Sequence, residues 1–343
     1  MNINPYISGI HHITAITSSA SENLAFYEDV LYLRLVKKTV NFDDPYTYHL
    51  YYADSAGTPG TIITFFPWEK LPRGSAGDGM VTSIAFSIPM GSVDYWCRRL
   101  NIHGIETTEG ERFGEHLIQF KDPHGLSLEL IESPKVYSNL NQSSNSKSVA
   151  NRIVGFHSAT ALLRSLEETQ SLLVNLMGMK LLNKEGNRYR FKMTRDDSLG
   201  NFYDVVVDPK AQNGRQGGGT VHHIAFRTSN EDEQKYWQKS LKDDGFSVTP
   251  IRDRKYFKSI YFNEPGGVLF EIATDPPGFT VDEPYESLGR DLKLPDQYES
   301  LRNEIESRLP KLQANRKRDV DLLYNDCISC KSQLENEQML TDS

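Results

Sequence analysis

The feature that most constrains the fold of this 343-residue chain is an internal repeat. Residues 95–132 and 236–274 both open with a Tyr-Trp pair in a helical pattern and reach a glycine where that helix should end. Each segment continues through a strand, a turn that contains proline, and a last strand that carries a glutamate, Glu129 or Glu271. The chain therefore repeats one small supersecondary unit.

The unit is completed by a strand that precedes each of these segments. Residues 83–89 and 223–229 alternate in polarity, as strands with one buried face do. Two further units begin at residues 9–16 and 154–163 and pass into helical patterns. A strand, a helix and about three strands, repeated four times, predict an α+β fold.

The polarity of the connecting segments predicts the domain organisation. Residues 138–152 are rich in Ser and Asn and indicate a linker between units two and three. We therefore expect an N-terminal domain at residues 8–136 and a C-terminal domain at residues 153–283. The repeat pattern ends at about residue 283, and residues 296–340 are charged and helix-prone. This predicts that residues 284–343 form a C-terminal helical extension or a partly disordered tail.

Charge and cysteine content exclude several classes of function. The net charge is −8 and no basic block occurs, which argues against nucleic acid or an anionic membrane as partner. No apolar run approaches the roughly 20 residues of a membrane helix, and the N-terminus lacks the pattern of a secretory signal. With only Cys97, Cys327 and Cys330, a reducing, cytoplasmic setting is predicted. Cys327 and Cys330 form a CxxC motif in a polar tail. Two free thiols without a role are favoured there over a zinc-binding site or a redox-active pair.

Residues able to bind a metal fall on the first and last strands of the unit, which should lie side by side in a curved sheet. Two histidines and one carboxylate on one face of a metal leave positions open for a substrate and O2, an arrangement that suits Fe(II). Unit two carries Glu129 but has no histidine on its first strand. Unit four alone has both residue types, as His223 and Glu271.

A third ligand must then come from unit one or unit three. The HHITA of unit one matches the HHIAF of unit four, which aligns His12 with His223 and His11 with His222. Because neighbouring strand residues face opposite ways, one histidine of each pair should point at the metal. A single histidine is more often a core or edge residue, but the doubled pairs favour a metal site. His157 of unit three stays an alternative ligand.

Over roughly residues 8–300 the chain resembles the vicinal oxygen chelate superfamily of glyoxalases and extradiol dioxygenases, and within it the ring-cleaving hydroquinone dioxygenases. The resemblance rests on the following segments, in this order and spacing: GIHHITAI, YTYHLYYADSAGTPGTIITFFPW, GFHSAT, TVHHIAF, YFKSIYFNEPGGVLFEIATD and GFTVDEPYESLGRDLKLP. It implies tandem βαβββ modules, as two glyoxalase-like domains, with Fe(II) held between the first and fourth modules. On this chain the implied iron ligands are His12, His223 and Glu271.

The same resemblance implies catalytic roles for four further pocket residues, His11, His222, Arg254 and Tyr261. Arg254 would steady a phenolate or peroxy anion, because its guanidinium stays charged. Tyr261 would exchange a proton with a ring oxygen. His11 and His222 would hydrogen-bond the substrate or brace the iron ligands. His49, among strand aromatics, is a further candidate for lining the pocket.

The implied function is an Fe(II)-dependent, ring-cleaving (extradiol-type) dioxygenase, with O2 and a small hydroquinone-like or catechol-like phenol as partners, in aromatic catabolism or detoxification. One alternative is a glyoxalase-type isomerase or lyase with Zn or Ni, for which Glu129 is the tempting fourth ligand. Another is a metal-free small-molecule binding protein of the same fold, which should lack the ligand set. The ring substituents, the role of the C-terminal tail and the existence of a homo-oligomer stay open.

Overall fold

The computed structural model describes residues 6–134, 151–193 and 199–312. All of the described strands and helices lie in one compact unit, Met1–Lys311. Most of the expected linker and both cysteines of the CxxC lie outside the described residues, so the predictions for them stay untested. None of the described helices is long and apolar enough to cross a membrane.

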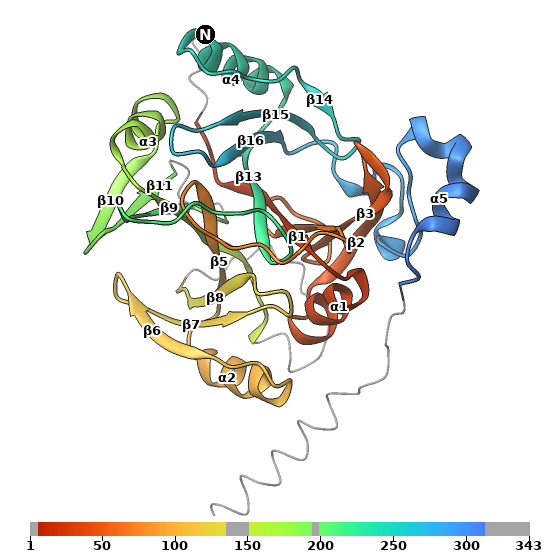
Figure 1. Cartoon of the computed structure of the whole chain (residues 1–343), viewed down its shortest axis with the longest axis horizontal. Helices are drawn as coiled ribbons and strands as arrows, with labels where there is room; N and C mark the ends of the chain where they lie inside the picture. The colour runs from red at the N-terminus through yellow and green to blue at the C-terminus, as the bar shows by residue number, and fades with distance from the viewer. Residues whose placement is uncertain (1–5, 135–150, 194–198, 313–343) are drawn as a thin grey trace, which may run out of the picture. The chain divides into compact units, whose positions relative to one another are not determined.

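The first of two eight-stranded sheets combines units one and four, in the order β14-β15-β16-β13-β1-β4-β3-β2 (Figure 1). Unit one supplies β1 (Ile10–Thr17), β2 (Arg34–Asn41), β3 (Asp44–Ala53) and β4 (Ile62–Pro67). Unit four supplies β13 (Thr220–Thr228), β14 (Arg252–Asp253), β15 (Lys258–Asn263) and β16 (Leu269–Thr274). The two units meet where β1 pairs antiparallel with β13.

The second sheet combines units two and three, in the order β10-β11-β12-β9-β5-β8-β7-β6. Unit two supplies β5 (Met80–Ile88), β6 (Thr108–Arg112), β7 (Glu115–Lys121) and β8 (Ser127–Glu132). Unit three supplies β9 (Gly155–Leu163), β10 (Lys180–Glu185), β11 (Arg188–Lys192) and β12 (Phe202–Val207). Here β5 and β9 form the central antiparallel pair.

A helical segment follows the first strand of each unit, as the repeat predicts. These segments are α1 (Ala20–Leu24) continuing as η1 (Ala25–Val30), α2 (Val93–Ile102), α3 (Glu167–Ser171) continuing as η3 (Leu172–Leu176), and α4 (Glu231–Asp243). The α+β fold of tandem strand–helix–strand modules is thereby confirmed. The partition into two domains at the linker stays a prediction, because the sheets join units across it.

The Tyr-Trp repeat has a simple structural cause in α2 and α4. Trp96 and Trp237 are buried, at 0% and 1% exposure, and anchor their helices on the sheets. Gly104 and Gly245 end the helical segments with φ of 72° and 92°, a conformation that glycine adopts without strain. The predicted helix ends are confirmed.

The described part of the C-terminal extension is helical, in short pieces. These pieces are η5 (Tyr285–Ser287), η6 (Asp296–Leu301) and α5 (Arg302–Arg308), and η4 (Phe279–Val281) precedes them. In unit one, Tyr46 Oη donates to Glu304 Oε1 at 2.8 Å, and Tyr298 Oη donates to the Phe42 carbonyl at 2.8 Å. In unit four, Lys255 Nζ donates to Asp296 Oδ1 at 2.9 Å. The extension thus supports the turn between β2 and β3.

Candidate metal centre

Three buried side chains from adjacent strands of the first sheet converge on one point. They are His12 on β1, His223 on β13 and Glu271 on β16, and one ligand atom of each lies within 4.8 Å of the others. Glu271 Oε2 is 3.4 Å from His12 Nε2 and 3.0 Å from His223 Nε2. Among the described residues, no other group of three histidine, cysteine or acidic side chains comes together in this way.

Strand register explains why these residues meet. Ala225 of β13 pairs with Glu271 on one side and with His12 on the other. His223 lies two residues before Ala225 and therefore points to the same face of the sheet. One residue from each of three neighbouring strands is thus brought together, although the ligands are 211 and 48 residues apart in sequence.

The second nitrogen of each candidate ligand histidine is hydrogen-bonded by the histidine that precedes it. His12 Nδ1 is 2.9 Å from His11 Nδ1, and His223 Nδ1 is 2.8 Å from His222 Nδ1. When His11 and His222 accept these hydrogen bonds, His12 and His223 carry their protons on Nδ1. Both Nε2 atoms then present a lone pair towards Glu271, as metal-binding histidines do.

The spacing of the three ligand atoms fits a bound cation better than a set of direct hydrogen bonds. Glu271 Oε2 is buried and has no hydrogen-bond partner among the described residues. Nitrogen and oxygen ligands at about 2.1 Å from a divalent metal stand roughly 3 Å apart when they subtend a right angle. The observed 3.0 and 3.4 Å agree with that geometry.

Electrostatics keep these groups in their metal-binding forms. Burial would raise the pKa of Glu271, but His12 and His223 outweigh it and hold that pKa well below its usual value. Burial lowers the pKa of His223 and, more strongly, that of His11. Burial, together with His223, lowers the pKa of His222 to about 3. At neutral pH the imidazoles of His11, His222 and His223 are therefore uncharged and the Glu271 carboxylate is ionised.

Ser259 on β15 fixes the orientation of the carboxylate and was missed at the level of sequence. Its hydroxyl donates to Glu271 Oε1 at 2.5 Å, which leaves Oε2 turned towards the two histidines. A signal existed in the strand alternation, because Ser259 lies two residues before Tyr261, on the same face. A single serine in a strand, however, does not indicate from sequence alone that its hydroxyl binds the carboxylate of a candidate metal ligand.

A cavity of about 470 Å³, within the range of small-molecule sites, opens in front of the cluster. His12 and His223 form part of its wall. The other lining residues are Asn41, Phe42, Asp43, His49, Tyr51, Phe66, Trp68, His222, Thr249, Arg252, Arg254, Phe257, Tyr261 and Leu269. Six of the sixteen lining residues are Phe, Tyr or Trp and four are His, so a flat ring matches this wall better than a polar chain.

Three of the four predicted pocket residues, His222, Arg254 and Tyr261, line this cavity. His11 does not line it; its ring lies 5.1 Å from the rings of both His12 and Phe257. His11 is thus placed to brace a ligand rather than to touch a substrate.

Arg254 and Tyr261 form a linked pair at one side of the cavity. Arg254 Nε donates to Tyr261 Oη at 3.4 Å, and its terminal nitrogen lies 3.5 Å from Asp43 Oδ2. Burial opposes the charge of Arg254, but Tyr261, Asp43 and Glu271 together raise its pKa. Burial and Glu271 raise the pKa of Tyr261. The pair therefore offers a permanent cation beside a protonated phenol.

His49 lines the cavity, as the sequence suggested it could. Its Nδ1 is 2.9 Å from Tyr51 Oη and its Nε2 is 2.7 Å from Thr64 Oγ1. Burial lowers the pKa of His49 well below its usual value and raises that of Tyr51. Both groups are therefore uncharged at neutral pH.

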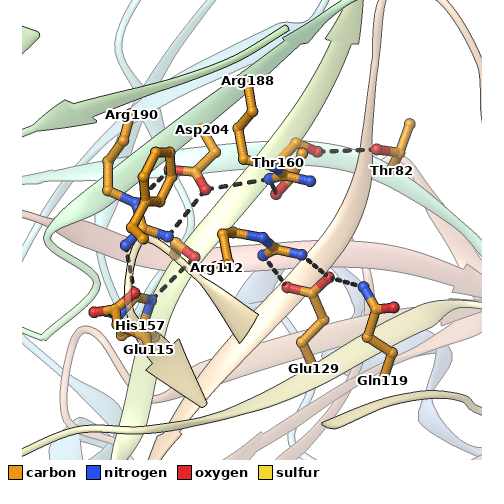
Figure 2. A network of polar contacts seen from close by, with 12 residues as sticks. Thr82, Arg112, Glu115, Gln119, Glu129, His157, Thr160, Arg188, Arg190 and Asp204 are labelled. Atoms are coloured by element: carbon orange, nitrogen blue, oxygen red, sulfur yellow. Dashed lines mark hydrogen bonds and ion pairs between the residues drawn. The ribbon is translucent and has the colours of Figure 1, made fainter. Parts of the chain in front are cut away.

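The alternative ligands His157 and Glu129 belong to the second sheet. His157 Nε2 is 3.1 Å from Glu115 Oε1. Arg112 donates to both oxygens of Glu129, at 2.6 and 2.8 Å (Figure 2). Both side chains are thus partnered within that sheet, and neither joins the cluster of the first sheet.

The repeat units match the model of one protein family. Residues 9–130 and 155–272 match the Glyoxalase/Bleomycin resistance protein/Dioxygenase superfamily. The two matches cover units one and two, and units three and four.

Similar proteins cover nearly the whole described chain. The "Putative ring-cleaving dioxygenase MhqO" of Bacillus subtilis is 47% identical over 302 residues, which are 88% of this chain and 95% of that protein. The "Chlorohydroquinone/hydroquinone 1,2-dioxygenase" of Sphingobium indicum is 35% identical over 318 residues, 89% and 97% of the two chains. A crystal structure described as a "putative dioxygenase" from Bacillus subtilis has a TM-score of 0.86 at 45% identity, and the match covers 91% of this chain and 99% of that one.

Proposed function

Because the chain belongs to the glyoxalase/bleomycin resistance protein/dioxygenase superfamily and aligns over most of its length with ring-cleaving dioxygenases, we propose that it cleaves hydroxylated aromatic rings with O2. The proposed substrates are hydroquinone-like or catechol-like phenols. The proposed metal is Fe(II), held by His12, His223 and Glu271. The proposed setting is cytoplasmic, in the catabolism or detoxification of such aromatics.

One observation carries the proposal: the His12, His223 and Glu271 cluster opens into an aromatic cavity. The three ligand atoms occupy one side of the expected metal position, which leaves other positions free towards the cavity. When bound, Fe(II) would supply a place where a substrate oxygen and O2 bind together and exchange electrons. The protein contributes the geometry and the charge around that place.

The residues beside the cluster support a phenol in its ionised form. Arg254 would stabilise negative charge on the substrate, because its guanidinium remains protonated inside the cavity. Tyr261 remains a proton donor and would hydrogen-bond a ring oxygen. Aromatic walls at Phe66, Trp68 and Phe257 would hold the ring flat and keep water away.

The proposed reaction breaks one carbon–carbon bond of the ring and places both atoms of O2 in the product. For a ring cut between a hydroxylated carbon and a neighbouring C–H carbon, the product ends are a carboxylic acid and an aldehyde. No further reductant is needed, because the ring itself supplies all four electrons.

A glyoxalase-type site is disfavoured by the state of Glu129. A fourth protein ligand would have to come from a carboxylate near the cluster, and Glu129 is instead bound by Arg112 in the other sheet. A metal-free binding protein would have no use for two buried histidines whose nitrogens converge on a buried carboxylate.

Anaerobic purification of the full chain, followed by metal analysis and O2 uptake with hydroquinone and catechol, tests the proposal. We expect stoichiometric iron, oxygen consumption and a ring-opened product. Tight zinc or nickel without oxygen uptake would refute the proposal. The matched variants are His12→Ala, which should lose the iron, and His157→Ala, which should retain it; loss of iron only in the second would overturn the ligand assignment.

A further inference from the structure

The turn between β14 and β15, residues 254–257, carries two side chains of the cavity wall. Arg254 and Phe257 both line the cavity, and Arg254 N donates to the Phe257 carbonyl at 2.9 Å across the turn. The ring of Phe257 lies 4.8 Å from the ring of His12. The conformation of this turn therefore decides where the guanidinium and the phenyl ring stand beside the candidate metal ligands.

The backbone of this turn does not favour its own conformation. Lys255, which directly follows Arg254, has a φ of 68°. This left-handed conformation costs a residue other than glycine roughly 1–2 kcal/mol. Contacts from outside the turn must offset that cost, and they come from the segment that follows β16, residues 275–283.

Asp282 makes the central contact between this segment and the turn. Asp282 Oδ2 accepts a hydrogen bond from Tyr256 Oη at 3.1 Å and lies 3.5 Å from Lys255 Nζ. Asp282 Oδ1 lies 2.6 Å from the Nζ of Lys37 on β2, whose side chain is 0% exposed and also pairs with Glu283. One carboxylate thus joins a strand of unit one to two residues of the turn in unit four.

Neighbouring contacts hold the same turn but are weaker or less specific. Gly278 N donates to the Tyr256 carbonyl at 2.9 Å, and the rings of Phe279 and Tyr256 lie 5.1 Å apart. Lys255 Nζ also donates to Asp296 Oδ1, but the Asp296 side chain is 95% exposed and its ion pair is screened by water. The Asp282 side chain is only 14% exposed, so its charge acts at short range with little screening.

We propose that Asp282 is a positioning residue: it fixes the turn at residues 254–257 and thereby places the Arg254 guanidinium beside the oxygen of a bound phenolate. Asp282 does not line the cavity itself and acts through Lys255 and Tyr256. The identity of the ligand rests on the proposed function, whereas the contact between Asp282 and the turn does not.

Hydrogen exchange on the full chain, loaded with Fe(II) without O2, tests the contact itself. Asp282→Ala should make the backbone amides of residues 254–257 exchange about tenfold faster, because a hydrogen bond and an ion pair are lost. The amides of β1 and β13 should keep their protection. Lys37 keeps Glu283 as its partner in this variant, so the fold should persist.

Binding of 4-nitrophenol to the same anaerobic protein tests the consequence for Arg254. The ionised form of this phenol absorbs at a longer wavelength than the neutral form, so a pH titration gives the pKa of the bound ligand. A cation close to the phenol oxygen lowers that pKa by about 1–3. Arg254→Met and Asp282→Ala should each raise it by about one. The double variant should match Arg254→Met, because both changes act through one guanidinium.

Two further variants control these measurements. Glu299→Ala is the matched control, since Glu299 also follows β16 but pairs with Arg302 at 2.7 Å. It should change neither the exchange at residues 254–257 nor the pKa of the bound phenol. Asp282→Asn keeps an acceptor for Tyr256 without the negative charge. It should show smaller changes in the same direction, and it carries the test if Asp282→Ala does not fold.

The outcomes separate this inference from the proposed function. Unchanged exchange at residues 254–257, additive effects of Asp282→Ala and Arg254→Met, or no binding of 4-nitrophenol by the unmodified chain would each overturn the role of Asp282. Faster exchange and a raised pKa in a chain that consumes no O2 would support that role while refuting the dioxygenase. Ring cleavage by the unmodified chain, with no effect of Asp282→Ala on exchange or pKa, would do the reverse.

Discussion

The two sheets have equivalent strand orders but different side chains around their central glutamates. In the first sheet β16, β13 and β1 lie side by side, and in the second sheet β8, β5 and β9 do. Ala85 of β5 pairs with Glu129 and with Ser158, as Ala225 of β13 pairs with a glutamate and a histidine. Glu129 and Ser158 are therefore the counterparts of two proposed ligands, and Ser83, two residues before Ala85, is the counterpart of the third.

A guanidinium occupies the centre of the second sheet. Arg112 binds both oxygens of Glu129, and Gln119 donates to the same carboxylate at 2.8 Å (Figure 2). Two further arginines and two acids extend the network, namely Arg188, Arg190, Asp204 and Glu115. Three cations and three anions thus share one partly enclosed region.

The arginine at this position has a counterpart in the first sheet. In β6, Gly110 pairs with Leu117, and in β14, Arg252 pairs with Ser259. Gly110 and Arg252 therefore occupy equivalent positions. Arg112 and Arg254 each lie two residues further along and are counterparts. Arg112 donates hydrogen bonds to Glu129. Arg254 instead donates to Tyr261, so that Glu271 faces His12 and His223. A buried carboxylate needs a cation in both sheets. A guanidinium has no open position for a substrate, whereas a bound metal would have one. This difference would separate the structural centre of the second sheet from the proposed catalytic centre of the first.

The largest effect is expected when the carboxylate of the first sheet is neutralised. Glu271→Gln should lose the iron and reduce O2 uptake by about a hundredfold or more, since even changes behind metal ligands cost 10–100-fold. Metal content and oxygen consumption measure it. Glu129→Gln is the matched change in the second sheet and should retain the iron; equal metal loss in both variants would contradict the distinction between the sheets.

The next effect is on stability and concerns the second sheet. Arg112→Met leaves Glu129 buried without its cation, which should lower the free energy of unfolding by about 3–5 kcal/mol. Denaturant titration measures this, and the iron content below the melting temperature should not change. Arg112→Met/Glu129→Met removes both charges and should recover most of the loss. A double variant as unstable as the single one would show that the network has another role.

A smaller effect is expected when the hydrogen bond from Ser259 to the Glu271 carboxylate is removed. Ser259→Ala removes the hydrogen bond to Glu271 Oε1 and should weaken iron binding about tenfold with little loss of stability. Competition with a chelator measures the affinity. The counterpart of Ser259 in the second sheet is Leu117, and Leu117→Ala should change stability but not iron affinity.

The smallest effect is a pH dependence that arises in the second sheet. Although burial opposes it, the hydrogen bond with His157 and the charge of Arg190 lower the pKa of Glu115 to about 2. A carboxylate with a depressed pKa stabilises the fold fully above its unfolded pKa, near 4.5, and loses that contribution as the pH falls towards 2. Glu115→Gln should therefore be less stable than the unmodified chain at pH 6, with the difference shrinking below pH 4. A difference that is independent of pH would contradict this account.

The repeat made most of the fold predictable. Period-two alternation, the Tyr-Trp helices and the glycines that end them are local signals, and the structure contains the corresponding elements. The pairing of unit one with unit four was less accessible, because it depends on which buried edges of distant strands fit together. The matching double histidines of units one and four pointed to that pairing, and the resemblance to known dioxygenases implied it as well.

The site was predictable where residues carry distinctive chemistry. The doubled histidines and Glu271 stood out, and the structure brings His12, His223 and Glu271 together. Ser259 and the aromatic wall did not stand out, since serine and aromatic residues occur in most strands. Their importance follows from distances across the sheet that only the folded chain defines.

Anomalous diffraction at the iron edge, on crystals grown anaerobically with Fe(II), tests the central claim most directly. We expect one strong peak between His12 Nε2, His223 Nε2 and Glu271 Oε2, and none beside Glu129, where the Arg112 guanidinium lies. A peak beside Glu129, or the absence of a peak at the histidine cluster in protein that contains stoichiometric iron, would contradict the account.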